Sequence, residues 1–224
     1  MIKIKPQAFF FDFDGVICNS EKAHMFSALK ALEPHQIDFT EDYYFEKLLG
    51  FDDRDLFSFV FDEKGKTKLD KETLKKLLKE KNQIFMSQIE KHIIYFEGVT
   101  EFINELHAKK IPLAVVSGAR SREVEACLKK GGLDVKFLFM ICADHVAHSK
   151  PHPEPYEKAF QKMLSLVDFD LDAKNCWVLE DSPAGVLSAQ KAGMKTIGIT
   201  NSLSRNDLLL ADHVIDHYRE IKIQ

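Results

Sequence analysis

The stretch from Ala8 to Val16 constrains the fold of this chain more than any other. It opens with Ala-Phe-Phe-Phe and then turns abruptly into Asp12-Phe13-Asp14-Gly15. A short apolar run bounded by a turn signal predicts a strand that is buried on both faces of a sheet. Ligands of open α/β sheets bind beyond the carboxyl ends of the strands, so Asp12 and Asp14 are predicted to lie in a binding site.

Two carboxylates at one strand end repel each other, so they need a cation or a shared proton. A hard divalent ion with oxygen ligands fits such a pair, and Mg²⁺ is the usual ion beside phosphate. Taken alone, the D-x-D-G pattern fits a strand followed by an acidic surface turn equally well. The other motifs of the chain are therefore needed to distinguish a metal-binding site from an acidic surface turn.

Helical and strand-like patterns alternate from residue 95 onward. Helices are predicted over residues 99–109, 122–130, 153–166 and 183–192. Strands are predicted over residues 112–118, 137–142, 176–179, 195–199 and 213–215. This alternation predicts an α/β fold with a doubly wound, mostly parallel, Rossmann-like sheet that carries helices on both faces.

The segment between the first strand and this alternating part is predicted to be wholly helical. Its four helices are one ending near Pro34, one running from Thr40 to Gly50, one beginning at Asp52 or Asp53, and one beginning at Asp70. We therefore expect a core domain of residues 1–18 and 93–224 and an inserted helical domain of residues 19–92. The lysines of the fourth helix indicate a solvated face, which leaves Arg54 as the cation that stands out in the insert.

Composition excludes several classes of function. The chain has 224 residues, a net charge of −4 and a hydrophobic content of 45%. It lacks the basic footprint of a nucleic-acid-binding protein and any apolar run of membrane-spanning length. Its start has no signal-peptide core, so we expect a cytoplasmic protein and, by default, a monomer. The four cysteines lack metal-like spacing and are predicted to be free, buried thiols.

Three further motifs place polar groups at strand ends or in loops on the edge where Asp12 lies. Ser117 and Gly118 offer a hydroxyl and backbone N–H groups as a phosphate cradle, or else form a helix N-cap. Lys150, between two prolines, is a point charge for a phosphate or a carboxylate, or else a solvated lysine. Glu180 and Asp181 follow an apolar strand and supply metal ligands, or else cap a helix. The occurrence of all these motifs in one chain is a more specific indication of a functional site than any one motif.

Taken in order, these motifs resemble those of the haloacid dehalogenase superfamily. The resemblance covers essentially the whole chain and rests on four segments: Asp12–Val16, Val116–Gly118, Lys150–Pro151 and Leu179–Gly185. It points to the branch in which a helical cap follows the first motif, which contains β-phosphoglucomutases and many small sugar-phosphate phosphatases. It thus implies a Rossmann-like core with an inserted four-helix cap.

The resemblance also implies a role for each core residue. Asp12 would be the nucleophile that attacks phosphorus, and Asp14 the general acid and then the general base. Mg²⁺ would be held by Asp12, the backbone carbonyl of Asp14 and Asp181, with Glu180 near or in its coordination shell. The phosphoryl oxygens would be held by the second and third motifs, that is, by Ser117, Gly118 and Lys150.

The function implied is that of a Mg²⁺-dependent phosphatase of a small phosphorylated metabolite, with a sugar phosphate as the expected substrate. Asp14 favours phosphate-ester chemistry, because the dehalogenases of the superfamily lack a carboxylate at that position. Two alternatives stay open: a β-phosphoglucomutase-like isomerase that returns the phosphoryl group to its substrate, and an inactive binding protein. In the cap, His24 and Arg54 are candidate substrate residues, or else polar residues on helix surfaces.

Overall fold

The computed structural model describes residues 1–48, 51, 53–65 and 68–224. The chain divides into two compact units. One contains Met1–Asn19 and Ile94–Gln224 and is called the core unit below; the other, Ser20–Ile93, is called the helical unit. The assignment of catalysis to the first and of a cap role to the second stays a prediction. None of the helices described is long and apolar enough to cross a membrane.

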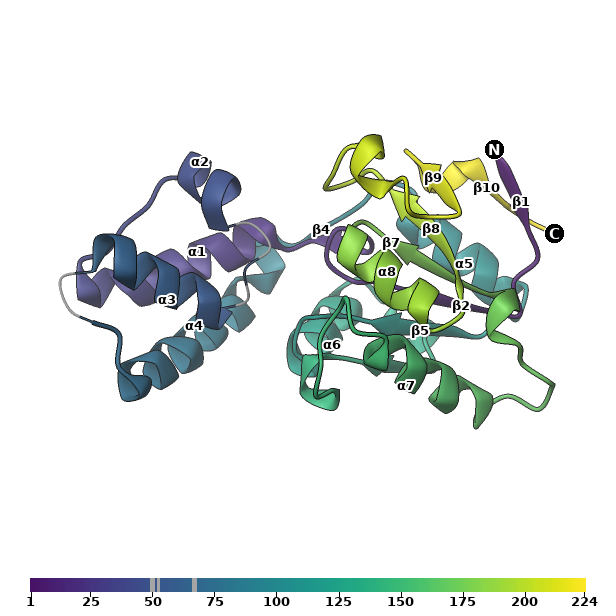
Figure 1. Ribbon diagram of the computed structural model, residues 1–224, viewed down its shortest axis with the longest axis horizontal. Helices are drawn as coiled ribbons and strands as arrows, with labels where there is room; N and C mark the ends of the chain where they lie inside the picture. Colours follow the sequence, from purple (N-terminus) through teal and green to yellow (C-terminus); the bar gives the residue numbers. More distant parts are fainter. Residues whose placement is uncertain (49–50, 52, 66–67) are drawn as a thin grey trace. The chain divides into compact units, whose positions relative to one another are not determined.

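A six-stranded parallel sheet forms the centre of the core unit (Figure 1). Its strand order is β6-β5-β2-β7-β8-β9. The strands are β2 (Ala8–Phe11), β5 (Leu113–Val116), β6 (Phe139–Ile141), β7 (Cys176–Glu180), β8 (Lys195–Ile199) and β9 (His213–Ile215). This arrangement confirms the predicted α/β fold, and the apolar run of the first strand is explained because β2 has a neighbour on each side.

Helices cover both faces of this sheet. They are α5 (Val99–Ala108), α6 (Ser121–Lys130), α7 (Glu154–Leu164) and α8 (Pro183–Lys191). Phe10 packs on one face with Tyr156 of α7 and Ala189 of α8. Phe9 points to the opposite face, where its ring lies 5.4 Å from that of Phe102 in α5. Successive residues of β2 therefore serve two hydrophobic layers, as the pleat of a strand requires.

Two small sheets complete the core unit, and neither was predicted from the sequence. Strand β1 (Ile2–Ile4) pairs in parallel with β10 (Ile221–Ile223). Strand β3 (Cys18–Asn19) pairs antiparallel with β4 (Ile94–Tyr95), so the chain leaves and re-enters the core unit through adjacent strands. Short 3₁₀ turns lie at Asp134–Lys136, Ala143–His145, Ala173–Asn175, Arg205–Leu208 and Tyr218–Glu220.

The helical unit contains α1 (Glu21–Leu32), α2 (Glu41–Tyr43), α3 (Asp53–Lys64) and α4 (Lys71–His92). A 3₁₀ turn, Glu33–His35, ends the first helix at Pro34 as predicted. Thr40 caps α2 and accepts a hydrogen bond from the Tyr43 amide. The second helix departs from expectation, because it continues after α2 as a π-helical segment, Tyr44–Leu48. Its predicted end at Gly50 and the possible cap at Asp52 lie outside the described residues.

One lysine of α4 is buried, which corrects the prediction that the lysines of this helix are solvated. The Lys81 side chain is 1% exposed. It lies on the same helical stripe as the buried Leu77 and Phe85, four residues to either side. Its ammonium contacts Asp53 Oδ1 at 2.8 Å and His24 Nδ1 at 2.6 Å. An ion pair and a hydrogen bond make the burial of this charge tolerable.

All four cysteines are free and buried, as predicted. Burial raises the pKa of the Cys142 and Cys176 thiols to about 12, so both stay protonated at neutral pH. They behave as small buried side chains rather than as reactive groups.

Candidate active site

Asp12 stands at the carboxyl end of the central strand, where the sequence predicted it. Its amide donates to the carbonyl of Leu179 in β7 at 2.9 Å, so the main chain stays in register with the sheet up to this residue. The side chain is only 10% exposed. Burial, and then the neighbouring Glu180, raise the pKa of the Asp12 carboxyl well above its usual range. The fold therefore holds this carboxyl group in a position that is electrostatically costly.

Lys150 supplies the compensating charge. Its ammonium lies 2.5 Å from Asp12 Oδ1 and 2.6 Å from Glu180 Oε1, and it donates to the carbonyl of Val116 at 2.9 Å. Burial by itself would lower the pKa of Lys150, but the attraction of Asp12 and Glu180 outweighs it and raises this pKa. The interpretation as a solvated loop lysine is therefore wrong, because this ammonium joins the ends of three strands.

Glu180 is completely buried and is already bound by three donors. Besides Lys150, the Tyr156 hydroxyl donates to Oε1 at 2.6 Å and the Ser182 hydroxyl to Oε2 at 3.1 Å. A Cβ atom at Gly185 would lie 1.9 Å from the Glu180 carboxyl carbon, so the close approach of α8 requires a glycine there. These contacts make Glu180 primarily the ion-pair partner of Lys150, rather than a metal ligand.

Tyr156 is a site residue that the sequence analysis missed. It lies in the first turns of α7, completely buried, and its ring lies 5.1 Å from the Lys150 ammonium. Burial, and then the Glu180 charge, raise the pKa of its hydroxyl, so it remains a hydrogen-bond donor. A tyrosine within an amphipathic helix looks like any core aromatic, so no local signal distinguishes it.

Asp181 joins Asp12 and Glu180 in a buried group of three carboxylates, whose oxygens lie within 4.8 Å of one another. Burial, and then the charge of Glu180, raise the pKa of Asp181 to about 7. Lys150 offsets one of the three negative charges, which leaves an excess of buried negative charge. An all-oxygen site with such an excess fits a hard divalent cation such as Mg²⁺.

The loop of the first motif runs directly against Asp181. Gly15 has a φ of +76°, and a Cβ atom there would lie 1.7 Å from Asp181 Oδ2. Both the backbone conformation and the close contact therefore require glycine after Asp14. Asp14 itself is partly exposed, unlike Asp12 and Asp181. The role of Asp14 in proton transfer stays a prediction.

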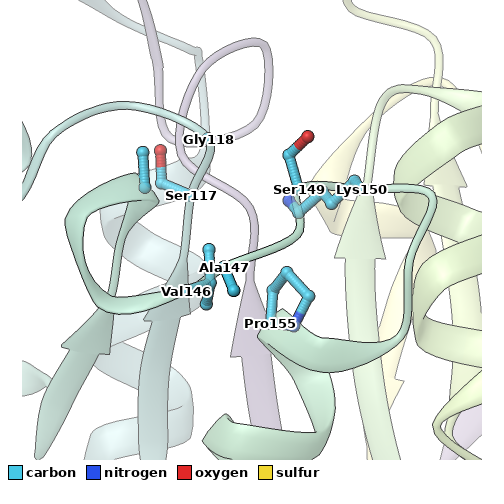
Figure 2. Close-up of a pocket in the computed structure, with 8 residues that line it drawn as sticks. Ser117, Gly118, Val146, Ala147, Ser149, Lys150 and Pro155 are labelled. Atoms are coloured by element: carbon cyan, nitrogen blue, oxygen red, sulfur yellow. The ribbon is translucent and has the colours of Figure 1, made fainter.

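A cavity of about 140 Å³ lies between the segment that follows β5 and the loop that carries Lys150 (Figure 2). For comparison, a cavity of about 150 Å³ holds a benzene-sized molecule. Its walls include the predicted phosphate-binding residues Ser117, Gly118 and Lys150. The other lining residues are Ala143, Val146, Ala147, Ser149 and Pro155. The Ser117 hydroxyl accepts from the Ala119 amide at 2.9 Å, whereas the N-cap of α6 is Arg120. The interpretation of Ser117 as the cap of that helix is therefore wrong.

The two cap candidates belong to the helical unit. His24 stacks on Phe85 with 4.4 Å between ring centroids, and burial, then the Lys81 charge, lower its pKa well below 6.5. His24 is thus a neutral imidazole at physiological pH. Arg54 lies exposed in the first turn of α3. A substrate role for either residue stays a prediction.

Known proteins resemble this chain over most of its length. Residues 9–199 match the family described as haloacid dehalogenase-like hydrolase. A phosphorylated carbohydrates phosphatase of Thermotoga maritima is 28% identical over 206 residues, which cover 91% of this chain and 90% of that protein.

Solved structures share the fold. A predicted phosphoglycolate phosphatase from Haemophilus somnus superposes with a TM-score of 0.84 at 20% identity, covering 96% of this chain and 95% of that one. A putative β-phosphoglucomutase from Thermotoga maritima gives a TM-score of 0.73 at 25% identity, with 93% of each chain covered. The sequence match begins in the strand that carries Asp12 and extends past Asp181, so it takes in every motif of the site. We conclude that this chain belongs to the haloacid dehalogenase-like hydrolases.

Proposed function

We propose that the protein is a Mg²⁺-dependent phosphatase that hydrolyses a small phosphorylated carbohydrate through an aspartyl-phosphate intermediate. The observation that carries the proposal is the position of Asp12, buried at a strand end between the Lys150 ammonium and the Asp181 carboxylate. The cavity lined by Ser117 and Lys150 shares this lysine with Asp12 and suits the phosphoryl group.

The residues of the core unit account for both halves of such a reaction. An oxygen of the Asp12 carboxylate forms a bond to phosphorus while the bond from phosphorus to the substrate's ester oxygen breaks. Asp14 gives its proton to that leaving oxygen. In the second half, Asp14 takes a proton from a water molecule, whose oxygen attacks phosphorus, and phosphate leaves as the Asp12 carboxylate is restored. Lys150 and the Ser117 hydroxyl hold the phosphoryl oxygens throughout.

Asp12 and Asp181 are the residues that we propose as side-chain ligands of Mg²⁺, together with the backbone carbonyl of Asp14. When bound, the ion supplies positive charge that stabilises the transferring phosphoryl group. Glu180 supports the site differently, because its contacts with Lys150 and Tyr156 hold the ammonium in place.

The carbohydrate part of the proposal is supported by the relative from Thermotoga maritima whose name describes that substrate class. The isomerase alternative requires a second phosphate group to be gripped by cations of the helical unit. Lys81 adds a cation that the sequence analysis did not count, but Asp53 already neutralises it at 2.8 Å. Desolvating a phosphate needs an available counter-charge, which Lys81 does not add to Arg54, so hydrolysis remains the function we favour.

The test is a panel of phosphorylated metabolites with Mg²⁺, scored for free phosphate and for isomerised product. We expect free phosphate from the wild type and from Asp168→Asn, an exposed control. Asp12→Asn should fold normally and release none, because an amide is a poor nucleophile and a poor metal ligand. Substantial turnover by folded Asp12→Asn would rule out the aspartyl-phosphate mechanism. Conversion of β-glucose 1-phosphate to glucose 6-phosphate faster than any phosphate release would favour the isomerase.

A further inference from the structure

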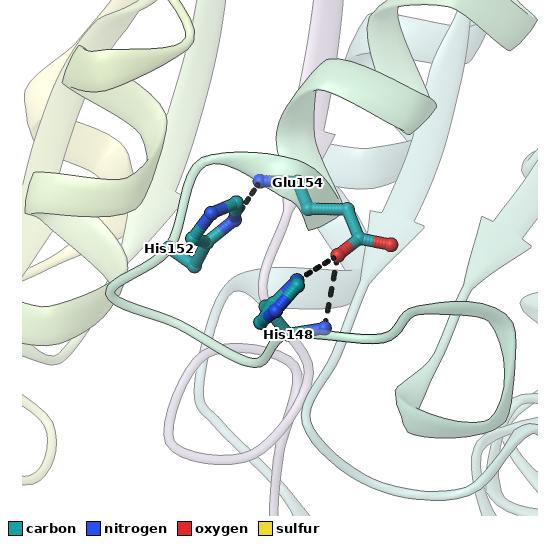
Figure 3. Close-up of side chains that lie close together, drawn as sticks. All are labelled: His148, His152 and Glu154. Atoms are coloured by element: carbon teal, nitrogen blue, oxygen red, sulfur yellow. Dashed lines mark hydrogen bonds and ion pairs between the residues drawn. The ribbon is translucent and has the colours of Figure 1, made fainter.

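Two histidines and a glutamate meet on the surface of the loop that carries Lys150 (Figure 3). The loop connects the Ala143–His145 turn to α7. His148 and His152 are exposed, and their rings stack with 4.6 Å between centroids. His148 Nδ1 lies 2.9 Å from Glu154 Oε2, and the Glu154 amide donates to His152 Nδ1 at 3.2 Å. All three side chains therefore converge on one patch of surface.

The main chain beneath this patch is fixed by hydrogen bonds. The Glu154 carboxylate accepts from the amides of Ala147 and His148, each at 2.9 Å. The hydroxyl of Ser188, from α8, donates to the carbonyl of His152 at 2.6 Å. The backbone is thus held in place, and a hydrogen bond to Glu154 already orients each exposed imidazole ring. Such a loop loses little conformational entropy when its side chains bind a common ligand.

The candidate ligand atoms of the three residues lie close to one another. One ligand atom from each residue lies within 4.8 Å of the others. Bonds of 2.0–2.1 Å in a tetrahedral zinc site place neighbouring ligands about 3.4 Å apart. Metal binding would therefore bring these atoms closer together and replace the present hydrogen bonds between the two rings and Glu154. A fourth position remains for water on the solvent side.

The chemical nature of the ligand atoms determines which metal ion would bind. Lys158 contacts Glu154 Oε1 at 2.7 Å, which leaves Oε2 facing His148. Together with the hydrogen bonds from Ala147 and His148, this contact holds the pKa of the Glu154 carboxyl well below its usual range, so the group is ionised. Imidazole nitrogens suit Zn²⁺ and its transition-metal neighbours, whereas Mg²⁺ prefers an all-oxygen set.

We propose that His148, His152 and Glu154 bind a transition-metal ion of the Zn²⁺ type, at a site separate from the carboxylate cluster of Asp12. The ion would join the residues on either side of Lys150. The ion would therefore stabilise the loop that carries Lys150, whose ammonium contacts Asp12, Val116 and Glu180. Binding should raise the unfolding temperature of the protein.

The experiment uses the full chain without a polyhistidine tag, in excess Mg²⁺ so that the carboxylate cluster is occupied. Zn²⁺ binding is followed by calorimetry, and Co²⁺ binding by its visible absorption bands, which report nitrogen ligation. We expect one site in the wild type. His148→Ala and His152→Ala should each weaken it roughly tenfold or more, since loss of even an outer-shell partner costs about 10–100-fold in affinity. His107→Ala, which removes an exposed histidine of α5, is the matched control and should bind as the wild type does.

Equal Zn²⁺ affinity in the wild type and both loop variants would overturn the proposal. So would Zn²⁺ binding that disappears in Asp12→Asn but survives in His148→Ala, because the ion would then occupy the carboxylate cluster. No readout here depends on turnover, so the result does not depend on whether the proposed phosphatase activity is correct.

Discussion

Replacing Lys150 with methionine tests the electrostatic account of the site most directly. The substitution keeps an unbranched apolar stem of similar length but removes an ammonium that contacts Asp12 at 2.5 Å and Glu180 at 2.6 Å. Both carboxylates would remain buried without a counter-charge. Breaking a buried ion pair by removing one partner typically costs about 3–5 kcal/mol of stability. For a chain of this size, that corresponds to a fall in Tm of roughly 6–20 °C.

The loss should depend on pH in a defined direction. A carboxyl group whose pKa is raised by folding, as for Asp12, destabilises the fold above that pKa, and protonation relieves the penalty as the pH falls. Lys150 itself has a raised pKa and stays charged in the wild type. The deficit of Lys150→Met should therefore be largest near about pH 8 and shrink toward about pH 5. The pKa of Asp181, about 7, places part of this change near neutrality.

The assay is thermal unfolding in the presence of a chelator, at several pH values, alongside turnover with Mg²⁺. Turnover should fall by about 10²–10³-fold, the usual effect of losing one group that stabilises charge in a transition state. Lys129→Met removes an exposed lysine that pairs with Glu125 one helical turn away, and it should leave both quantities near the wild-type values. Unchanged stability of Lys150→Met near pH 8, or unchanged turnover, would refute the argument.

Four further outcomes are expected. A chelator should stop phosphate release and Mg²⁺ should restore it, whereas Ca²⁺ should restore it poorly because of its looser, higher coordination; full activity in excess chelator would contradict this. Asp14→Ala should abolish hydrolysis while a folded protein remains in circular dichroism. Gly15→Ala should lower the unfolding temperature, because its φ is +76° and its Cβ would meet Asp181; a stability equal to wild type would contradict the strain. Arg54→Ala should mainly raise KM, and a loss confined to kcat would argue against a binding role.

The sequence predicted the core unit well because each strand end carries its own signal. Asp12, Ser117 and Glu180 each follow an apolar run directly, and parallel strands bring such ends to one edge. The sequence did not predict which partners the side chains at these strand ends contact. Glu180 and Asp181 are neighbours in sequence, yet Glu180 turns toward Lys150 and Tyr156. That difference depends on α7 and on Gly185, which local patterns do not reveal.

The features that the sequence analysis missed depend on distant partners. Strands β1 and β10 are Ile-Lys-Ile segments at opposite ends of the described chain, and neither is long enough to signal a strand alone. Lys81 is one of many lysines in α4, and only its place between Leu77 and Phe85 marks it as inward-facing. A helical stripe that includes a lysine is normally assigned to the surface, because burying its charge is costly without partners such as Asp53 and His24.

The pairing of β3 with β4 holds the two ends of the helical insertion side by side. Asn19 lies opposite Ile94 across this antiparallel pair, so the two points where the chain crosses between units are adjacent. Opposed residues in such a pair lie only about 5 Å apart, a span that a two-residue hairpin turn can bridge. The entropy of closing a loop grows only slowly with its length, so a hairpin can carry a whole folded unit in place of a tight turn. A shortened chain in which Asn-Gly replaces Ser20–Ile93 is therefore expected to retain the six-stranded sheet, which circular dichroism and thermal unfolding can check.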